Sequence, residues 1–321
     1  MNETNGKFVV TGCAGFIGSN LVDYLLTQNY SVIGLDNLST GKKENLRNAC
    51  QDPRFSFYEV DLLEDKLLDN YFLNVDTVFH FAANADVRFG ANHPKRDLEQ
   101  NLIVTHNILE SMRRNKVFKI VFSSTGSVYG EASVIPTSED AFFPVQTSLY
   151  GASKIAAESL IQAYCETFEM QSWIFRFVSI LGPRYSHGHV FDFYEQLRSN
   201  PNYLKVLGDG HQKKSYLHIE DCIEAIHLSL TRSCNKINIF NLGINGVCEV
   251  RDSIAWICDS LNMNPEINFG TSSKGWIGDN PYIHLDISKI QSLGWQPQKT
   301  IEDGVRDTVA YLQENEWLFE R

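Results

Sequence analysis

The feature that most constrains the fold is a glycine-rich turn between a short β-rich run and an amphipathic helix. The turn is Gly12-Cys13-Ala14-Gly15-Phe16-Ile17-Gly18, and it separates the run 7–11 from the helical spacing of 16–28. Gly12 permits a sharp turn, Gly15 lets phosphate approach the backbone, and Gly18 lets the helix pack on the strand. The turn, with the first helical residues Phe16 and Ile17, therefore predicts a site for a dinucleotide pyrophosphate.

An acidic residue stands where the next strand is expected to end. Asp36 closes the run 31–35 and lies 18 residues after Gly18. A carboxylate at this place accepts hydrogen bonds from the adenosine ribose and repels a 2′-phosphate, so it favours NAD over NADP. Asp61 closes the run 55–60 and could accept from the adenine amino group, although an Asp at a strand end as often caps a helix.

Strand-like and helical segments alternate along the first half of the chain. The β-rich runs are 7–11, 31–35, 55–60, 77–81, 118–123, 172–177 and 237–242, and helical spacing covers 16–28, 97–114, 148–168, 250–261 and 301–315. The alternation predicts an α/β fold, a Rossmann-type doubly wound parallel sheet covered on both faces. Because the rhythm breaks after Gly182-Pro183, we expect a dinucleotide-binding domain over 1–178, with a return around 213–243, and a smaller C-terminal substrate-binding lobe over 179–212 and 244–321.

Composition and charge limit the partners. The net charge of −11 argues against non-specific binding of nucleic acid, which depends on Lys and Arg. The seven cysteines are scattered without a C-x-x-C pair, so neither a zinc site nor a redox pair is indicated, and they fit a reducing compartment. The polar N-terminus is not a signal peptide, and no apolar run approaches the ~18 residues of a membrane span. We expect a cytoplasmic protein with no metal and no membrane partner.

Two further motifs carry polar groups suited to proton transfer. Ser123-Ser124-Thr125 ends a predicted strand, and Tyr150 and Lys154 are four residues apart on one face of the helix 148–168. An ammonium beside a phenol lowers the pKa of the phenol, so Tyr150 could take a hydroxyl proton near neutral pH. The Thr125 hydroxyl could hold the substrate oxygen and share that proton. With the glycine turn, these motifs predict a site that moves a hydride and a proton on one carbon.

The order of these motifs resembles the nucleotide-sugar epimerase/dehydratase group of the extended short-chain dehydrogenases/reductases. Further matching segments are 36–41, 60–62, 80–83, 123–130, 182–184, 208–210, 241–243 and 293–295. The resemblance implies that Thr125, Tyr150 and Lys154 are catalytic and that Lys154 also bonds the nicotinamide ribose. It implies that NAD is held by Gly12, Gly15, Phe16, Ile17, Gly18, Asp36, Asn37, Ser39, Thr40, Gly41, Asp61, Leu62, Phe81, Ala82, Ala83, Asn101 and Ser123, together with Tyr150 and Lys154. Helices 97–114 and 148–168 resemble the pair that forms a homodimer interface in the family.

Family chemistry begins with oxidation at C4 of a hexose carried on a nucleoside diphosphate. Return of the hydride to the other face gives an epimer, loss of water gives a dehydratase, and release of NADH gives a dehydrogenase. In 4,6-dehydratases of the group, Asp and Glu follow the Thr, whereas here Gly126 and Ser127 do. We therefore expect an NAD-dependent nucleotide-sugar 4-epimerase, with a 4-dehydrogenase as the alternative and a dehydratase third. Glu131 keeps the third possibility open.

The expected substrate residues depart from the family pattern. Ser179 stands where Asn is usual, Lys214 and Trp276 stand where Arg is usual, and a diphosphate normally attracts paired guanidinium groups. The candidates to compensate are His187, His189, Lys213, Lys214 and Arg184, although the histidines equally fit loop decoration. Trp276 could stack on a base or close the sugar pocket, and it also fits ordinary packing. Tyr216 follows Lys214 in the matching segment, and Val206 belongs to a run that meets the base through backbone groups. These departures leave the sugar and the base open.

Overall fold

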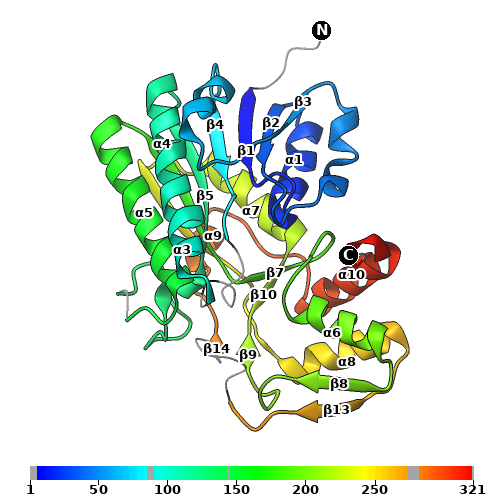
Figure 1. Cartoon of the computed structure of the whole chain (residues 1–321). Helices are drawn as coiled ribbons and strands as arrows, with labels where there is room; N and C mark the ends of the chain where they lie inside the picture. Colours follow the sequence, from blue (N-terminus) through cyan, green and yellow to red (C-terminus); the bar gives the residue numbers. More distant parts are fainter. Residues whose placement is uncertain (1–5, 85–89, 91, 143–144, 274–281, 320–321) are drawn as a thin grey trace. The chain divides into compact units, whose positions relative to one another are not determined.

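A parallel sheet of seven strands forms the centre of the part of the chain that contains the glycine turn. The strand order is β11-β6-β5-β4-β1-β2-β3. The strands are β1 (Lys7–Thr11), β2 (Ser31–Asp36), β3 (Phe55–Glu59), β4 (Thr77–His80), β5 (Lys119–Thr125), β6 (Gln171–Phe177) and β11 (Ile237–Leu242). Figure 1 shows helices α4 (Val104–Asn115) and α5 (Leu149–Phe168) on one side of this sheet and α1 (Phe16–Thr27) on the other. The predicted Rossmann-type fold is confirmed.

The chain divides into two units. This computed structural model describes residues 6–84, 90, 92–142, 145–273 and 282–319. Unit 1 comprises Met1–Val128, Gln146–Arg176 and Ile226–Phe240, and unit 2 comprises Tyr129–Val145, Phe177–Ala225 and Asn241–Arg321. The sequence places 129–145 in the dinucleotide domain and the return at 213–243. In the structure Tyr129 and Thr137 bond within unit 2: the Tyr129 hydroxyl donates to Asn241 Oδ1 (2.8 Å), and Thr137 N donates to the His284 carbonyl (3.0 Å).

The sheet reverses its order between β1 and β4. Strands β2 and β3 continue outward from β1, whereas β5 and β6 continue outward from β4. The registers are parallel, with Thr11 opposite both Leu35 on β2 and His80 on β4. In open parallel sheets a ligand binds beyond the carboxyl ends of the strands at such a reversal. The glycine turn after β1 and the segment after β4 therefore occupy the expected binding position.

An apolar cluster joins the sheet of unit 1 to α4 and α5. Its fully buried members come mainly from the strands and the inward faces of both helices; they include Val9, Leu35, Val78, Ile108, Ile120, Ile161 and Ile174. Complete burial of one aliphatic side chain contributes about 1.5–3 kcal/mol. This packing fixes α5, and with it Tyr150 and Lys154, against β5.

The predicted helix over 97–114 is wrong as a single regular helix. The chain forms α3 (Pro94–Asp97), a π-helical segment η4 (Leu98–Ile103) and then α4. The wider turn coincides with Asn101, whose side chain is buried and bonded to neighbouring segments. Periodicity cannot reveal this interruption, because apolar spacing continues through it. Such π-helical turns often occur at functional sites.

Unit 2 is built from short strands and five helices among its described residues. Strands β7 (Ser179–Leu181) and β10 (Tyr216–His218) pair, β8 (Tyr203–Val206) pairs with β13 (Glu266–Phe269), and β9 (Lys213–Lys214) lies between β12 (Cys248–Glu249) and β14 (Tyr282–Ile283). The helices are α6 (His189–Ser199), α7 (Ile219–Arg232, which continues into unit 1), α8 (Val250–Leu261), α9 (Ser288–Gln291) and α10 (Ile301–Glu314). No described helix has the length and apolar character needed to cross a membrane.

Short 3₁₀ helices lie between the longer elements or follow them. They are η1 (Lys43–Leu46), η2 (Ala49–Gln51), η3 (Asp65–Tyr71), η5 (Gly126–Tyr129) and η6 (Glu316–Phe319). Local signals fix several helix starts. Thr300 and Asp303 form reciprocal side-chain to backbone bonds at the start of α10, and Glu249 and Asp252 do the same for α8.

Candidate active site

The glycine turn leaves no room for side chains at two positions. Gly12 has φ +69°, and a Cβ there would lie 2.7 Å from Ala82 N. A Cβ on Gly18 would lie 2.1 Å from the Gly12 carbonyl oxygen, so the first turn of α1 packs directly on the turn. A Cβ on Gly15 would meet only the Gly12 oxygen, at 3.2 Å, and is otherwise open. The turn thus presents bare backbone on the side of Gly15.

The start of α1 is suited to an anion. Its N-cap is Gly15, which supplies no side-chain hydrogen bond, and its first turn contains no acidic residue. The positive end of the helix dipole is therefore not neutralised by the protein's own side chains. Phe16 is buried and Ile17 half-buried at this helix start. The open backbone at Gly15 and the uncapped helix fit the pyrophosphate of a dinucleotide.

Asp36 lies buried at the end of β2 and is held by backbone amides. Its Oδ2 accepts from Ala14 N (2.9 Å) and its Oδ1 from Leu38 N (2.8 Å). Burial raises the pKa of the Asp36 carboxyl, and the two backbone bonds oppose this rise. A carboxylate has about four acceptor positions, so two remain for ribose hydroxyls. Asp36 is consequently fixed in direction before any ligand binds.

The loop after β2 closes back on the glycine turn. Ser39 N donates to Asn37 Oδ1 (3.1 Å), Ser39 and Thr40 are exposed, and Gly41 is buried. The Ala14 carbonyl accepts from Lys42 N and from the side chain of Asn45, each at 3.0 Å. Sequence reasoning missed Asn45, which is buried and ties this loop to the turn. Its role leaves no motif in the sequence, in which Asn45 is only one polar residue of a loop.

The segment after β4 is held by Thr11. The Thr11 hydroxyl oxygen accepts from Phe81 N (3.1 Å) and Ala82 N (3.2 Å), and it contacts His80 Nδ1 at 2.8 Å. The other ring nitrogen of His80 lies 3.0 Å from the Thr105 hydroxyl of α4. Burial and the nearby Lys154 charge lower the pKa of His80 to about 3, so the ring is neutral. This network, which the sequence did not predict, places the half-buried residues Phe81, Ala82 and Ala83.

Asp61 and Leu62 follow β3. Asp61 Oδ1 accepts from Leu63 N (3.0 Å) within the turn that follows β3, whereas Glu64 is the N-cap of η3, so Asp61 does not cap a helix. The Leu62 carbonyl accepts from Asn107 Nδ2 of α4 (3.0 Å). Asn107 therefore fixes this strand end from the helix above it.

Thr125, Tyr150 and Lys154 meet at the carboxyl end of β5. Ser148 caps α5 by accepting from Gly151 N (3.0 Å), which places Tyr150 in the first helical turn. The side chains of Tyr150 and Thr125 are hydrogen-bonded. Thr125 Oγ1 also donates to Ser127 Oγ (3.2 Å). The Lys154 ammonium donates to the Ser123 carbonyl (2.8 Å) and lies 4.7 Å from the centre of the Phe122 ring.

Burial controls the proton affinities of this trio. It raises the pKa of the Tyr150 phenol to about 12, against the effect of the Thr125 hydrogen bond and with a smaller contribution from Asp97. It lowers the pKa of Lys154 to about 7, while Glu158 and Asp97 oppose this shift. The sequence predicted that Lys154 would lower the Tyr150 pKa. In the protein alone this does not occur, because desolvation dominates and the ammonium is directed at Ser123.

Asn101 bonds the π-helical segment η4 to two places: the segment after β4, and helix α5, which carries Tyr150 and Lys154. Its Oδ1 accepts from Asn84 N (2.9 Å), and its Nδ2 donates to Ser153 Oγ of α5 (2.9 Å). Asp97 accepts from Asn84 Nδ2 (2.8 Å). Neither Asn84, Asp97 nor Ser153 was predicted as a site residue. The signal that could have found them is a polar cluster inside segments otherwise spaced as core.

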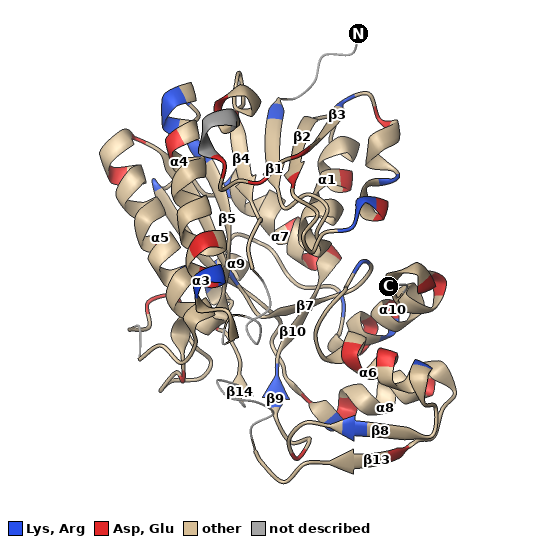
Figure 2. Ribbon diagram, viewed as in Figure 1, with Lys and Arg blue, Asp and Glu red and all other residues tan. Residues whose placement is uncertain are grey.

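Four of the predicted substrate residues come together in unit 2. Tyr216 is opposite Ser179 in the pairing of β10 with β7. The rings of His189 and Tyr216 have centres 4.8 Å apart. Burial, with the charge of Lys214 added, lowers the pKa of His189 to about 3. Figure 2 shows β9, which consists of Lys213 and Lys214, as a basic strand. The group combines one neutral imidazole with lysine charges.

The remaining substrate candidates are placed differently. Arg184 has a left-handed backbone (φ +75°), and the exposed ring of His187 stacks on Tyr185 with centres 5.9 Å apart. Val206 is buried in β8, and its carbonyl accepts from Gly270 N (3.2 Å). Of the four residues that come together, by contrast, Ser179 is exposed, Lys214 half-buried and Tyr216 buried. Trp276 lies outside the described residues.

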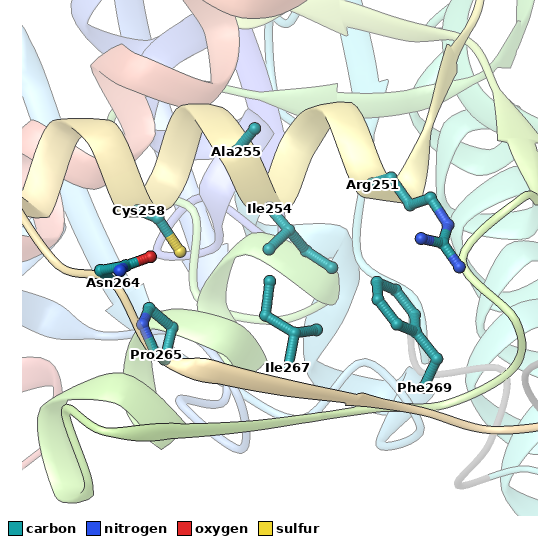
Figure 3. Close-up of a pocket in the computed structure, with 8 residues that line it drawn as sticks. All are labelled: Arg251, Ile254, Ala255, Cys258, Asn264, Pro265, Ile267 and Phe269. Carbon is teal, nitrogen blue, oxygen red and sulfur yellow. The ribbon is translucent and has the colours of Figure 1, made fainter.

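A separate cavity of about 300 Å³ lies within unit 2 between α8 and β13 (Figure 3). Its walls are mainly apolar, and Arg251 lies 3.9 Å from the centre of the Phe269 ring at one end. Among the described residues, none of the predicted catalytic, cofactor or substrate residues lines it; the lining residues are Arg251, Ile254, Ala255, Cys258, Asn264, Pro265, Ile267 and Phe269. The cavity therefore does not belong to the candidate active site.

The fold and the arrangement of glycine turn, Asp36 and Thr-Tyr-Lys trio define a dinucleotide-dependent enzyme of the short-chain dehydrogenase/reductase class. Residues 8–243 match the NAD dependent epimerase/dehydratase family. A putative UDP-glucose 4-epimerase of Methanocaldococcus jannaschii is 33% identical over 96% of this chain and 98% of its own length. The chain belongs to the NAD dependent epimerase/dehydratase family, and the relatives that it resembles include nucleotide-sugar 4-epimerases. The predictions of an enzyme and of NAD as cofactor are confirmed.

Solved structures agree with this chain over nearly its whole length. A crystal structure of UDP-galactose 4-epimerase is 35% identical and superposes with a TM-score of 0.87, covering 97% of this chain and 100% of the other. A UDP-glucuronic acid 4-epimerase from Bacillus cereus, in complex with UDP-glucuronic acid and NAD, is 30% identical with a TM-score of 0.88. In that case 96% of this chain and 99% of the other are covered. The similarity thus includes unit 2 as well as the sheet of unit 1.

Proposed function

We propose that this protein is an NAD-dependent 4-epimerase of UDP-hexoses that acts by transient oxidation at C4 of the sugar. The observation that carries the proposal is the hydrogen-bonded Tyr150–Thr125 pair beside Lys154 at the end of β5, followed by Gly126 and Ser127 instead of carboxylates. The choice of uridine rests on the related 4-epimerases, whose descriptions name UDP-sugars.

The proposed chemistry assigns one proton to Tyr150. NAD, when bound, supplies a reversible acceptor for the C4 hydride and a positive charge near the phenol. Tyr150 takes the proton of the C4 hydroxyl in the oxidation and returns it in the reduction, so that no atom is gained or lost overall. Thr125 holds the C4 oxygen and shares the proton through its bond to Tyr150. The Lys154 ammonium donates a hydrogen bond to the Ser123 carbonyl and so keeps the end of β5 in place.

The turn after Thr125 separates the epimerase from a dehydratase. Loss of water from C6 requires an acid and a base near the 4-keto sugar. Thr125 instead bonds to Ser127, whose hydroxyl does not ionise near neutral pH and cannot act as a carboxylate does. The 4-keto intermediate should therefore be reduced again, with its substituents intact.

The four clustered residues of unit 2 support binding of the nucleotide sugar. Lys214 provides a charge for a diphosphate, and the neutral His189 provides a ring nitrogen that accepts or donates one hydrogen bond. Its Nε2 is buried and has no hydrogen-bond partner among the described residues. A buried polar atom in this state gains from a ligand partner. We propose that His189 and Lys214 contact the nucleotide sugar.

A homodimer remains a proposal. Apolar side chains are exposed on the helical side of unit 1, where Leu98, Ile103, Leu149 and Phe168 project from η4 and α5. Exposed apolar groups of this kind favour contact with a second protein surface. The same helices, η4 with α4 and α5, are those expected from the family resemblance.

Product analysis tests the proposed reaction. The purified enzyme is incubated separately with UDP-glucose, UDP-glucuronic acid and UDP-N-acetylglucosamine, and products are examined by NMR and mass spectrometry. We expect one of them to give a C4 epimer of unchanged mass without net NADH. A product lighter by one water would identify a dehydratase, and one lighter by two hydrogens with stoichiometric NADH would identify a dehydrogenase. The Tyr150→Phe variant is the control for a contaminating activity.

A further inference from the structure

Glu158 extends the line of functional residues on α5 by one further turn. Tyr150, Lys154 and Glu158 are each four residues apart and therefore share one helix face. Lys154 is 2% and Glu158 0% exposed. A fully buried carboxylate is costly unless it is paired and hydrogen-bonded, so its presence needs a specific reason.

The Glu158 carboxylate is paired with a buried arginine of the next strand. Arg176 on β6 is 1% exposed and donates from Nη2 to Glu158 Oε2 (2.7 Å) and from Nε to Oε1 (3.1 Å). The Ser124 hydroxyl donates to the same Oε1. Replacement of such a buried pair by apolar residues is often neutral for stability, so stability alone does not explain it.

The contacts of α5 hold three successive residues of β5. The Lys154 ammonium lies over the ring of Phe122 and donates to the carbonyl of Ser123, while Glu158 receives the hydroxyl of Ser124. The next residue of β5 is Thr125. Glu158 thus fixes the strand immediately before the residue that bonds to Tyr150.

Charges of both signs surround Lys154. The negative groups are Glu158 on α5 and Asp97 at the end of α3, and both favour its charged form. His80 on β4 is neutral, and Tyr150 is protonated. Arg176 is a second permanent positive charge bound to the carboxylate of Glu158. Without Glu158, this guanidinium would remain buried without its counter-charge.

We propose that Glu158 is a positioning residue that acts through Lys154: by neutralising Arg176 and holding Ser124, it favours the charged form of the lysine amine and keeps that amine at the end of β5. The inference rests on the proposed function only in giving Lys154 a role in the reaction. The charge state of Lys154 itself is measurable in the protein without substrate. Sequence motifs end at Tyr150 and Lys154, and the arrangement adds Glu158 and Arg176 to them.

The test is a titration of Lys154 in the intact protein. The chain is labelled with lysine carrying ¹³C at Cε, and the Lys154 resonance is assigned by its absence in Lys154→Arg. In Glu158→Gln, which keeps the size and hydrogen-bonding shape, we expect the titration midpoint to move to lower pH by about one unit, since one nearby opposite charge is lost. In Glu158→Asp, which keeps the charge, we expect the midpoint within a few tenths of a unit of wild type.

Replacement of Arg176 is expected to shift the Lys154 titration midpoint in the opposite direction. Arg176→Met frees the Glu158 charge to act on Lys154 alone, so the midpoint should rise, and Glu158→Gln with Arg176→Met should return it toward wild type. An unchanged midpoint in either single variant that folds would overturn the proposal. The two single variants make the test independent of the folding of one of them.

Kinetics separate this role from simple structural support. In Glu158→Gln the alkaline limb of the kcat profile should move to lower pH by about the same amount as the Lys154 midpoint. A uniform loss at all pH values, with an unmoved midpoint, would indicate structural support only and would overturn the proposal. If the wild type turns over no UDP-sugar, the proposed function fails, but the midpoint shift in Glu158→Gln still decides the role of Glu158.

Discussion

The two units hold their candidate residues in different ways. In unit 1, Tyr150 and Lys154 lie on a helix of 20 residues packed on a buried sheet, and Thr125 ends a strand of seven. In unit 2, Ser179 and Tyr216 lie on strands of three residues, and Lys214 lies on a strand of two. Long packed elements fix side-chain positions more rigidly than short strands and loops do. The contrast suggests that unit 1 fixes the chemistry and unit 2 adapts the choice of substrate.

The polar partners show the same contrast. Beside Lys154 the buried side chains of Ser124 and Arg176 both bond to the Glu158 carboxylate, so these three groups form a closed network. His189 in unit 2 keeps a buried ring nitrogen with no partner in the described part of the chain. A closed network resists change, whereas an unfilled polar atom is completed by a ligand. Substitutions in the two units should therefore affect different kinetic constants.

The largest expected effect is at Tyr150. Tyr150→Phe removes the group that exchanges the proton and should lower kcat by about 10²–10⁴-fold, while NAD binding is retained. Turnover and bound NAD are measured on the same preparation. The matched control is Tyr164→Phe on the same helix, where the hydroxyl donates to Glu110 at the surface (2.9 Å), and it should keep full activity. If Tyr150→Phe keeps more than a tenth of wild-type activity, Tyr150 is not the catalytic base.

The elements of unit 1 could be predicted because short-range rules determine them. Gly12 and Gly18 are fixed by backbone clearance, and Tyr150 and Lys154 by helical periodicity, so each leaves a pattern in the sequence. Glu158 has the same spacing but was missed, because its partner Arg176 is 18 residues away and lies in an otherwise apolar strand. Contacts across strands are not encoded in local spacing.

The second effect in size is expected at Asp36. Asp36→Ala leaves Ala14 N and Leu38 N without their acceptor and removes the ribose contacts, so NAD binding should weaken by about 1–3 kcal/mol. The discrimination against NADP should fall, since no carboxylate remains to repel the 2′-phosphate. Dissociation constants for both cofactors are measured. Glu59→Gln is the control, because Glu59 is the exposed acid opposite Asp36 on β3.

An unchanged preference for NAD in Asp36→Ala would show that another group selects the cofactor. A changed preference in Glu59→Gln would show that general negative charge at this sheet edge is sufficient. Either result would contradict the interpretation that single residues held in fixed positions determine cofactor binding in unit 1.

Unit 2 was less predictable for a physical reason. The group of Ser179, His189, Lys214 and Tyr216 forms by pairing of short strands far apart in sequence and by ring contacts. Strands of two or three residues are too short for a periodicity of two to be recognised. The sequence shows that Lys214 stands where arginine is usual in the family. It does not show which residues lie beside Lys214 in the folded chain.

The smallest expected effect is at His189, and it concerns KM. Burial holds the pKa of His189 at about 3, well below its usual range, so the ring is neutral throughout pH 5–8 and becomes charged only as the pH falls toward 3. KM should therefore show no inflection from this histidine between pH 5 and 8. His189→Phe keeps the ring contacts with Tyr216 and Phe193 but removes the nitrogens. Loss of one neutral hydrogen bond should raise KM about two- to tenfold with kcat unchanged.

His187→Phe is the matched control, because the His187 ring is exposed and stacks on Tyr185. It should change KM by no more than about twofold, as expected for a surface substitution. A fall in kcat in His189→Phe, with KM unchanged, would place this residue with the chemistry rather than with substrate binding. The assignment of chemistry to unit 1 and of substrate choice to unit 2 would then be wrong, because a ring of unit 2 would contribute to the step assigned to Tyr150.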